Sequence, residues 1–172
     1  MAQNSFTHHC RQEADTAALA QKLASSLSQL FQLGPSVHLN ISLKGDLGAG
    51  KTTFARHLIQ SLGYEGRVKS PTYTLCEPYP LIIHGKTLAM NHFDLYRMRD
   101  TLEWQEAGFV EYFDEPGFCL VEWPEKAEGT LPAFDIEIHL MAGADQNERN
   151  ITFQANSIQA MAALEKMGIQ QK

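Results

Sequence analysis

Hydrophobic residues recur along this chain with two distinct periods. Apolar positions three and four residues apart predict an amphipathic helix that begins near Asp15 or Thr16 and ends at Gly34-Pro35, and a second helix over 54–62. Alternating or continuous apolar runs of strand length lie at 37–43, 73–75 with 81–83, 87–95, 118–123, 136–140 and 151–153. Helices interspersed with strands in this way predict one α/β domain whose sheet mixes parallel and antiparallel strands.

Local signals refine this outline. The turn His84-Gly85-Lys86 predicts a hairpin, and the spacing of residues 100–103 is that of a capping box that opens a short helix toward Phe113. Residues 1–13 are polar and are expected to form a flexible tail, whereas 157–172 are expected to form a C-terminal helix and tail. Polar residues alternate with apolar ones in the strand at 37–43, which predicts that one face of the sheet is only partly covered.

The most specific signal for chemistry is a glycine-rich run between the first of these strands and the helix that follows it. Residues 45–53 read Gly-Asp-Leu-Gly-Ala-Gly-Lys-Thr-Thr and match the phosphate-binding loop Gly-x-x-x-x-Gly-Lys-Ser/Thr. Glycine allows the backbone N–H groups to turn toward a polyphosphate, and the start of the helix adds unpaired N–H donors. In this pattern Lys51 lies at the β- and γ-phosphates and the Thr52 hydroxyl binds Mg²⁺. We therefore predict a single P-loop NTPase-like domain with a mixed parallel/antiparallel sheet flanked by helices.

Phosphoryl transfer also needs a carboxylate that holds the metal and a group that responds to the γ-phosphate. Glu122 follows the apolar run 118–121 as a Walker B acid would, and Asp94 follows a second strand. Ser70-Pro71-Thr72 lies between the loop helix and the hairpin, where it resembles a switch segment, although a turn fixed by the proline is an equally good interpretation. Asp94 and Thr72 are the candidates for orienting a water molecule.

Composition narrows the choice of partners and location. The formal net charge of the 172-residue chain is −6, which argues against direct nucleic-acid binding as its main activity, because phosphate contacts require clustered Lys and Arg. The longest apolar runs are strand-sized, and the N-terminus has no apolar core before a cleavage site, so we expect a cytoplasmic protein without a membrane span. The three cysteines have no Cys-x-x-Cys spacing, and His8-His9-Cys10 is interpreted as a solvated tail in preference to a metal site.

Four motifs in series make the chain similar to a known family. Besides the loop, they are Val-Lys-Ser-Pro-Thr-Tyr-Thr-Leu at 68–75, His-Phe-Asp-Leu-Tyr-Arg at 92–97 and Leu-Val-Glu-Trp-Pro at 120–124. In order and spacing they resemble the TsaE family, the bacterial ATPases of tRNA threonylcarbamoyladenosine biosynthesis, over about 16–140. The chain departs from the family pattern after Arg97, and no shared signature follows Leu140.

The resemblance implies a small Mg²⁺-dependent ATPase that acts with the TsaB and TsaD proteins, the threonylcarbamoyl transferase complex. The complex would hold the tRNA and modify the adenosine beside the anticodon of tRNAs that read ANN codons. By this resemblance the catalytic candidates are Lys51, Asp94, Glu122 and Thr72, and the Mg²⁺ ligands are Thr52 and Glu122. The expected ATP contacts are Thr16, Asp46, Leu47, Gly48, Ala49, Gly50, Lys51, Thr52 and Thr53. No arginine finger is evident, so we expect slow hydrolysis by the isolated chain and activation by its partners.

Other functional classes stay open. A P-loop small-molecule kinase would need a lid that carries arginines and a pocket for an acceptor, and no arginine-rich lid stands out. A nucleotide-binding scaffold without essential hydrolysis would need only the loop. A GTPase would need an Asn/Thr-Lys-x-Asp motif, which the chain lacks, so adenine is preferred to guanine by elimination.

Overall fold

The computed structural model describes residues 5–34, 37–71 and 73–167, in which strands and helices alternate along the chain. The strands are β1 (Ser5–Cys10), β2 (His38–Lys44), β3 (Cys76–Ile83), β4 (Lys86–Asp94), β5 (Gly117–Glu122), β6 (Ile136–Ala142) and β7 (Arg149–Ala155). The helices are α1 (Glu13–Leu33), α2 (Lys51–Ser61), α3 (Glu103–Glu106) and α4 (Ile158–Lys166), with 3₁₀ turns η1 (Val110–Phe113) and η2 (Pro124–Ala127). The predicted α/β fold with helices around a mixed sheet is confirmed.

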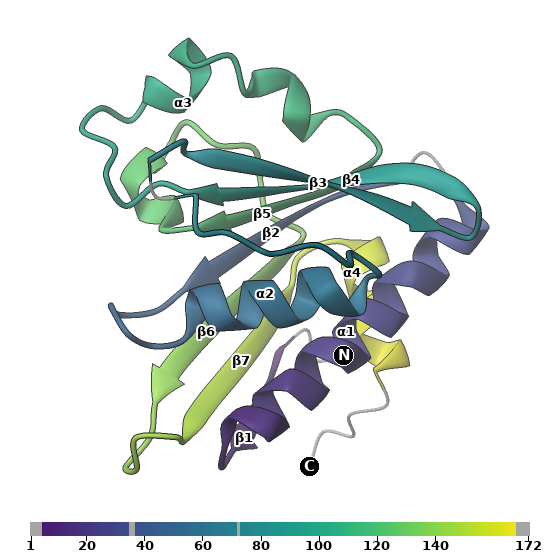
Figure 1. The fold of residues 1–172 in the computed structure, drawn as a ribbon, viewed down its shortest axis with the longest axis vertical. Helices are drawn as coiled ribbons and strands as arrows, with labels where there is room; N and C mark the ends of the chain where they lie inside the picture. The colour runs from purple at the N-terminus through teal and green to yellow at the C-terminus, as the bar shows by residue number, and fades with distance from the viewer. Residues whose placement is uncertain (1–4, 35–36, 72, 168–172) are drawn as a thin grey trace.

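The strands form one sheet in the order β1-β7-β6-β2-β5-β4-β3 (Figure 1). Its centre is parallel, since β2 pairs in parallel with β5 and β6, and β5 with β4. The outer pairs β1/β7, β6/β7 and β3/β4 are antiparallel. The register places Glu122 opposite both Leu43 and Asp94, so the carboxyl ends of the three central strands meet at one edge of the sheet.

Helices cover the two faces unequally. Helices α1, α2 and α4 pack against one face, where Leu23, Phe54 and Leu58 are fully buried among the strand residues. A smaller cluster on the opposite face contains Trp104 of α3 and Phe113 of η1, packed against β4 and β5. The segment between β4 and β5 therefore covers the second face of the central strands.

The prediction of a lightly covered face is wrong for β2 itself. Its polar residues Asn40 and Ser42 are buried, at 6% and 0% exposed. Asn40 is accommodated because its side-chain amide donates to the carbonyl oxygen of Ala133 at 3.2 Å. The open face lies farther along the sheet, where β6, β7 and β1 carry partly or fully exposed polar side chains on the side away from α1: Thr7, His9, Glu137, His139, Asn150 and Thr152.

The flexible tail predicted for residues 1–13 is also wrong within the part that the structure describes. Residues 5–10 form β1, which pairs antiparallel with β7, and α1 begins at Glu13. The Phe6 ring stacks on Phe153 with 5.0 Å between centroids, and Cys10 is buried. The strand depends on a pairing partner about 140 residues downstream, so its short and mostly polar sequence carried little local signal.

Two smaller differences concern the predicted hairpin and the helix after it. The hairpin forms with the expected turn, in which His84 and Gly85 both have positive φ, but residues 73–75 lie in a turn before β3. The helix predicted from 100 toward Phe113 is interrupted at Gly108, whose φ is 88°, and divides into α3 and η1. No helix in the described ranges has the length and apolar character needed to cross a bilayer.

Candidate functional site

The glycine-rich loop has a backbone that only glycine adopts without strain. Gly45, Gly48 and Gly50 have φ angles of 155°, 81° and 98°. A Cβ atom on Gly45 would lie 2.6 Å from the carbonyl oxygen of Leu140 on β6, so the loop also passes too close to the sheet for a side chain. Gly50 then caps α2, whose first residue is Lys51, and the free N–H groups of this helix end face the loop.

Lys51 is held at the mouth of the loop and is only 5% exposed. Its ammonium group donates to the carbonyl oxygens of Gly45 and, at 3.0 Å, Asp46, and it lies 3.9 Å from the centroid of the Trp123 ring. Burial lowers the pKa of Lys51, and the nearby carboxylates, Glu122 first among them, act in the opposite direction. The cation is thus largely removed from solvent, and its hydrogen-bond partners among the described residues are neutral carbonyls.

The carboxylate of Glu122 lies between α2 and β4. Glu122 is 1% exposed, and its Oε1 accepts a hydrogen bond from the Thr52 hydroxyl at 3.0 Å. Its Oε2 lies 2.6 Å from Nε2 of His92, which is fully buried. The expected metal ligands Thr52 and Glu122 are therefore in direct contact.

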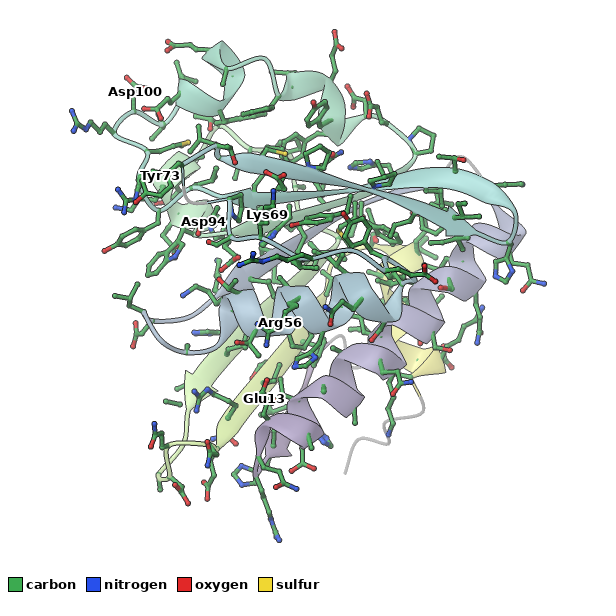
Figure 2. All side chains as sticks on the ribbon, in the orientation of Figure 1. Glu13, Arg56, Lys69, Tyr73, Asp94 and Asp100 are labelled. Carbon is green, nitrogen blue, oxygen red and sulfur yellow. The ribbon has the colours of Figure 1, made fainter. Side chains whose placement is uncertain are left out.

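Asp94 ends β4 beside this pair, at the left edge of the sheet in Figure 2. Its Oδ1 accepts the N–H of Tyr96 at 3.0 Å. Burial is the main cause that raises the pKa of Asp94. The Tyr96 N–H opposes the shift and the charge of Glu122 adds to it. The site therefore contains two acidic side chains that are nearly inaccessible to solvent.

A cavity of about 480 Å³ joins these groups. It is lined by Leu47, Gly48, Gly50, Lys51, Thr52, Thr53, Ser70, Asp94, Tyr96, Arg97, Glu122, Trp123 and Arg149. Most of the residues expected from the sequence thus line one space. Asp46 contributes a carbonyl to Lys51 instead, and Thr72 lies outside the described residues.

Thr16 and Ala49 line a second, smaller cavity of about 110 Å³ on the other side of the loop. Gly50, Thr53 and Arg149 border both cavities. The start of α1 thus lies beside the loop.

An ion pair on the outer side of α2 links it to the same end of α1. Arg56 and His57 approach the Glu13 carboxylate at 3.5 Å and 3.2 Å. Figure 2 labels Arg56 on α2 and Glu13 at the start of α1. The Glu13 side chain is mostly exposed, so these contacts add little stability.

Two side chains of the site were not assigned a role from the sequence. Arg149 begins β7, and its guanidinium donates to the loop carbonyls of Ala49 at 2.8 Å and Gly48 at 3.4 Å. No local pattern marked it, because it is an isolated arginine a hundred residues from the loop. His92 begins the His-Phe-Asp-Leu-Tyr-Arg motif at 92–97, but nothing in the sequence indicated that it contacts Glu122.

Comparisons with known proteins agree on one family. The family model "Threonylcarbamoyl adenosine biosynthesis protein TsaE" matches residues 10–151. The "tRNA threonylcarbamoyladenosine biosynthesis protein TsaE" of Haemophilus influenzae is 39% identical over 152 residues, covering 88% of this chain and 92% of the relative. The protein of the same name from Bacillus subtilis is 42% identical over 115 residues, covering 67% and 68% of the two chains. The crystal structure of Bacillus subtilis YdiB superposes with a TM-score of 0.71 at 28% identity, covering 98% of this chain and 97% of that one.

Proposed function

Because this chain belongs to the TsaE family, we propose that it is a Mg²⁺-dependent ATPase required to form N6-threonylcarbamoyladenosine in tRNA. The observation that carries the proposal is the contact between the Thr52 hydroxyl and the Glu122 carboxylate at the mouth of the glycine-rich loop. It joins a phosphate-binding element to an acid from a different strand. A loop that only bound phosphate would not require this acid.

The spacing of these two oxygens supports a magnesium ion. A hydroxyl and a carboxylate oxygen are ligands that suit Mg²⁺. Oγ1 of Thr52 and Oε1 of Glu122 already lie 3.0 Å apart, so these two residues would hold the ion together. Mg²⁺ usually keeps water and phosphate oxygens as its other ligands.

The remaining groups fit the chemistry of phosphoryl transfer. Bound Mg²⁺ would supply positive charge to the phosphate oxygens. Lys51 and the N–H groups at the start of α2 would stabilise the charge that develops as the γ-phosphate is transferred. The present partners of Lys51 are two carbonyls and an aromatic ring, which a phosphate anion would replace with a stronger, charge-assisted interaction.

We also propose where the base or ribose of the nucleotide lies and which residue orients the water. We assign the base or ribose to the neighbourhood of Thr16, because its cavity shares Gly50 and Thr53 with the phosphate site. Asp94 is our candidate for orienting water, since it ends its strand directly opposite Glu122. Thr72 stays a second candidate on sequence alone.

We further propose that the TsaB and TsaD proteins are the partners and that they hold the tRNA. The net charge of −6 suits a protein that does not bind tRNA directly. Two arginines line the main cavity, but Arg149 is bonded to loop carbonyls and Arg97 stacks on Tyr73 at 4.6 Å. Neither is free to serve as an arginine finger without rearrangement. We therefore expect slow ATP hydrolysis by the isolated chain and faster hydrolysis in the complex with its partners. We propose that this complex acts in the cytoplasm.

The proposal is tested by replacing a bacterium's own TsaE with variants of this chain and measuring threonylcarbamoyladenosine in its tRNA by mass spectrometry. Wild type should restore the nucleoside, whereas Lys51→Ala and Glu122→Ala should not. Ile82→Ala, an exposed position on β3, is the control and should restore it fully. Failure of wild type to restore the nucleoside would contradict the assignment.

The scaffold alternative predicts a different result for one variant. A protein that needs only to bind nucleotide would lose activity with Lys51→Ala but keep it with Glu122→Ala. The fold offers the scaffold no separate support, since a buried acid in contact with Thr52 is not needed for assembly alone. ATP hydrolysis by the purified complex of each variant distinguishes the two functions.

A further inference from the structure

We propose that His92 is a positioning residue that holds the metal-binding carboxylate of Glu122 in place. The inference rests on the proposed function, because it concerns how the Mg²⁺ ligand is oriented. His92 does not line the cavity, and it acts through Glu122 without contact to substrate.

The geometry divides the carboxylate between two elements. Oε1 of Glu122 accepts from Thr52 on α2, and Oε2 lies 2.6 Å from Nε2 of His92 on β4. His92 is 0% exposed and Glu122 1% exposed, so bulk solvent has little access to the contact between them. Oε2 therefore contacts a residue of the sheet, and Oε1 contacts the helix that follows the loop.

The sheet register explains why this histidine reaches Glu122. Asp94 is the direct partner of Glu122 across the parallel pair of β4 and β5, and His92 is the partner of Leu120. Residues two apart on a strand point to the same face, so His92 lies one step behind Glu122, on the side away from the strand ends. Both strands are central and buried, which makes this support more rigid than a loop would be.

The contact with Glu122 indicates which nitrogen of His92 is the donor. An ionised carboxylate has only acceptor oxygens, so the 2.6 Å contact with Oε2 of Glu122 requires a proton on Nε2. Nε2–H then donates to Oε2. Nδ1 is buried and has no hydrogen-bond partner among the described residues, so no other contact orients the ring.

Loss of this donor should affect the metal and leave the loop intact. Without it, Oε2 would be a buried carboxylate oxygen with no partner, and the side chain would turn to find one. Lys51 donates its hydrogen bonds to the loop carbonyls of Gly45 and Asp46 and not to His92, so nucleotide binding without metal should persist. Partners that orient a metal ligand are typically worth about 10–100-fold in metal affinity.

The test compares His92→Asn with His92→Gln in the full chain. The amide nitrogen of glutamine occupies nearly the same position as Nε2, whereas that of asparagine matches Nδ1. We measure the affinity for a non-hydrolysable ATP analogue by calorimetry, with Mg²⁺ and with EDTA. His92→Asn should weaken binding about 10–100-fold in Mg²⁺ and not in EDTA. His92→Gln should restore binding in Mg²⁺ to within a few-fold of wild type.

Three results would overturn the inference. The first is that both variants bind the ATP analogue with the same affinity. The second is that Mg²⁺ increases the affinity of His92→Asn as much as that of wild type. The third is that His92→Asn loses affinity equally with Mg²⁺ and with EDTA, which would indicate a structural role only. If Mg²⁺ does not increase the affinity of wild type for the ATP analogue, the proposed function fails as well. If Mg²⁺ does so for wild type and the two variants behave alike, only the role of His92 fails.

NMR of the wild-type protein tests the same contact without relying on whether a variant folds. The ¹⁵N NMR shifts of the His92 ring, assigned by their absence from His92→Gln, report which nitrogen is protonated. A proton on Nε2 alone supports the proposal. A proton on Nδ1 alone would contradict it.

Discussion

The central strands and the outer strands β6, β7 and β1 belong to one sheet but differ in their relation to the site. Every residue of β5 is buried, and with β4 it supplies Glu122, Asp94 and His92. The outer strands bury one face against the helices and leave the other open and polar. Of the described residues of these strands, Arg149 alone lines the main cavity, and its guanidinium contacts the main chain of the loop.

This difference shows that the fold places the acidic side chains of the site on the central strands, and that the outer strands contact the backbone of the loop. Acidic groups that are removed from water must be fixed by neighbours, and parallel strands covered on both faces provide such neighbours. The pairs on the open face are polar and solvent-accessible, such as the hydroxyls of Thr7 and Thr152 at 2.8 Å. We therefore expect substitutions in the centre to change chemistry and substitutions in the outer strands to act through the loop or hardly at all.

The largest effect should follow from Lys51→Ala. Removing a buried cation from a phosphate site costs about 4 kcal/mol, roughly 1,000-fold in nucleotide affinity. Lys44→Ala is the control, because Lys44 is partly exposed and pairs with Glu137 at 3.5 Å, outside the cavity. Calorimetry with ATP should show a loss only for Lys51→Ala. Similar affinities for both variants would refute the assigned role of the loop.

The next effect concerns the point where the loop touches the outer strands. Gly45→Ala would force a Cβ atom to within 2.6 Å of the Leu140 carbonyl oxygen, so we expect about 3 kcal/mol lower stability. Gly85→Ala is the matched control, since its φ is also positive but no atom lies within 4 Å of the added Cβ. It should lose only about 1–2 kcal/mol from backbone strain. Urea unfolding of both variants checks this order, and equal losses would exclude the close approach as a cause.

Arg149→Ala should have a moderate effect on nucleotide affinity, about tenfold. A hydrogen bond to a charged group contributes about 1.5–3 kcal/mol, part of which the loop regains by binding nucleotide. Arg67→Ala, an exposed arginine, should leave affinity unchanged. If Arg149→Ala bound ATP as tightly as wild type, the outer strands would have no part in forming the site.

Asp94→Asn should have a smaller effect on stability, and its sign depends on pH. The raised pKa means that the folded chain binds the Asp94 proton more tightly than the unfolded chain does. This stability is present below the ordinary aspartate pKa of about 3.9 and is lost as the pH rises through the higher folded value. Asparagine stays neutral and can still accept the Tyr96 N–H, so the variant should melt higher than wild type at neutral pH and similarly in acid.

The exposed Asp114 provides the control for this titration. Asp114→Asn should show no such dependence on pH when melting temperatures are recorded from acid to neutral pH without nucleotide. A lower melting temperature of Asp94→Asn at neutral pH would contradict the account of a desolvated carboxylate.

The smallest effect is expected on the open face. Thr152→Val removes the hydroxyl contact with Thr7 but keeps a β-branched side chain in the strand. We expect a change in stability within about 0.5 kcal/mol and no change in ATP affinity. A tenfold change in affinity would show that the separation between centre and outer strands is not real.

The sequence predicted those parts of the site whose geometry is local. The residues from Gly45 to Thr53 are contiguous, and their spacing alone specifies a loop before a helix. Glu122 and Asp94 could be placed because each ends an apolar strand, and parallel strands end at one edge. The similarity to the TsaE family was also evident from four short motifs, and the family match extends to residues 10–151.

The parts that could not be predicted depend on distant neighbours. His92 is a polar residue within a buried strand, and its contact with Glu122 follows from a register that no local pattern encodes. Arg149 meets the loop across a hundred residues. Strand β1 forms by pairing antiparallel with β7, which no local pattern in residues 5–10 indicates. The positive φ of Gly108 interrupts the helix that the pattern around it predicts.

The most direct test of the account is a crystal structure of this chain with a non-hydrolysable ATP analogue and Mg²⁺. We predict the β- and γ-phosphates on the N–H groups of residues 48–53 with Lys51 beside them. The metal should be bound by Oγ1 of Thr52 and, directly or through one water, by Oε1 of Glu122. An analogue bound away from the loop, or a metal that Glu122 contacts neither directly nor through one water, would contradict the central claim.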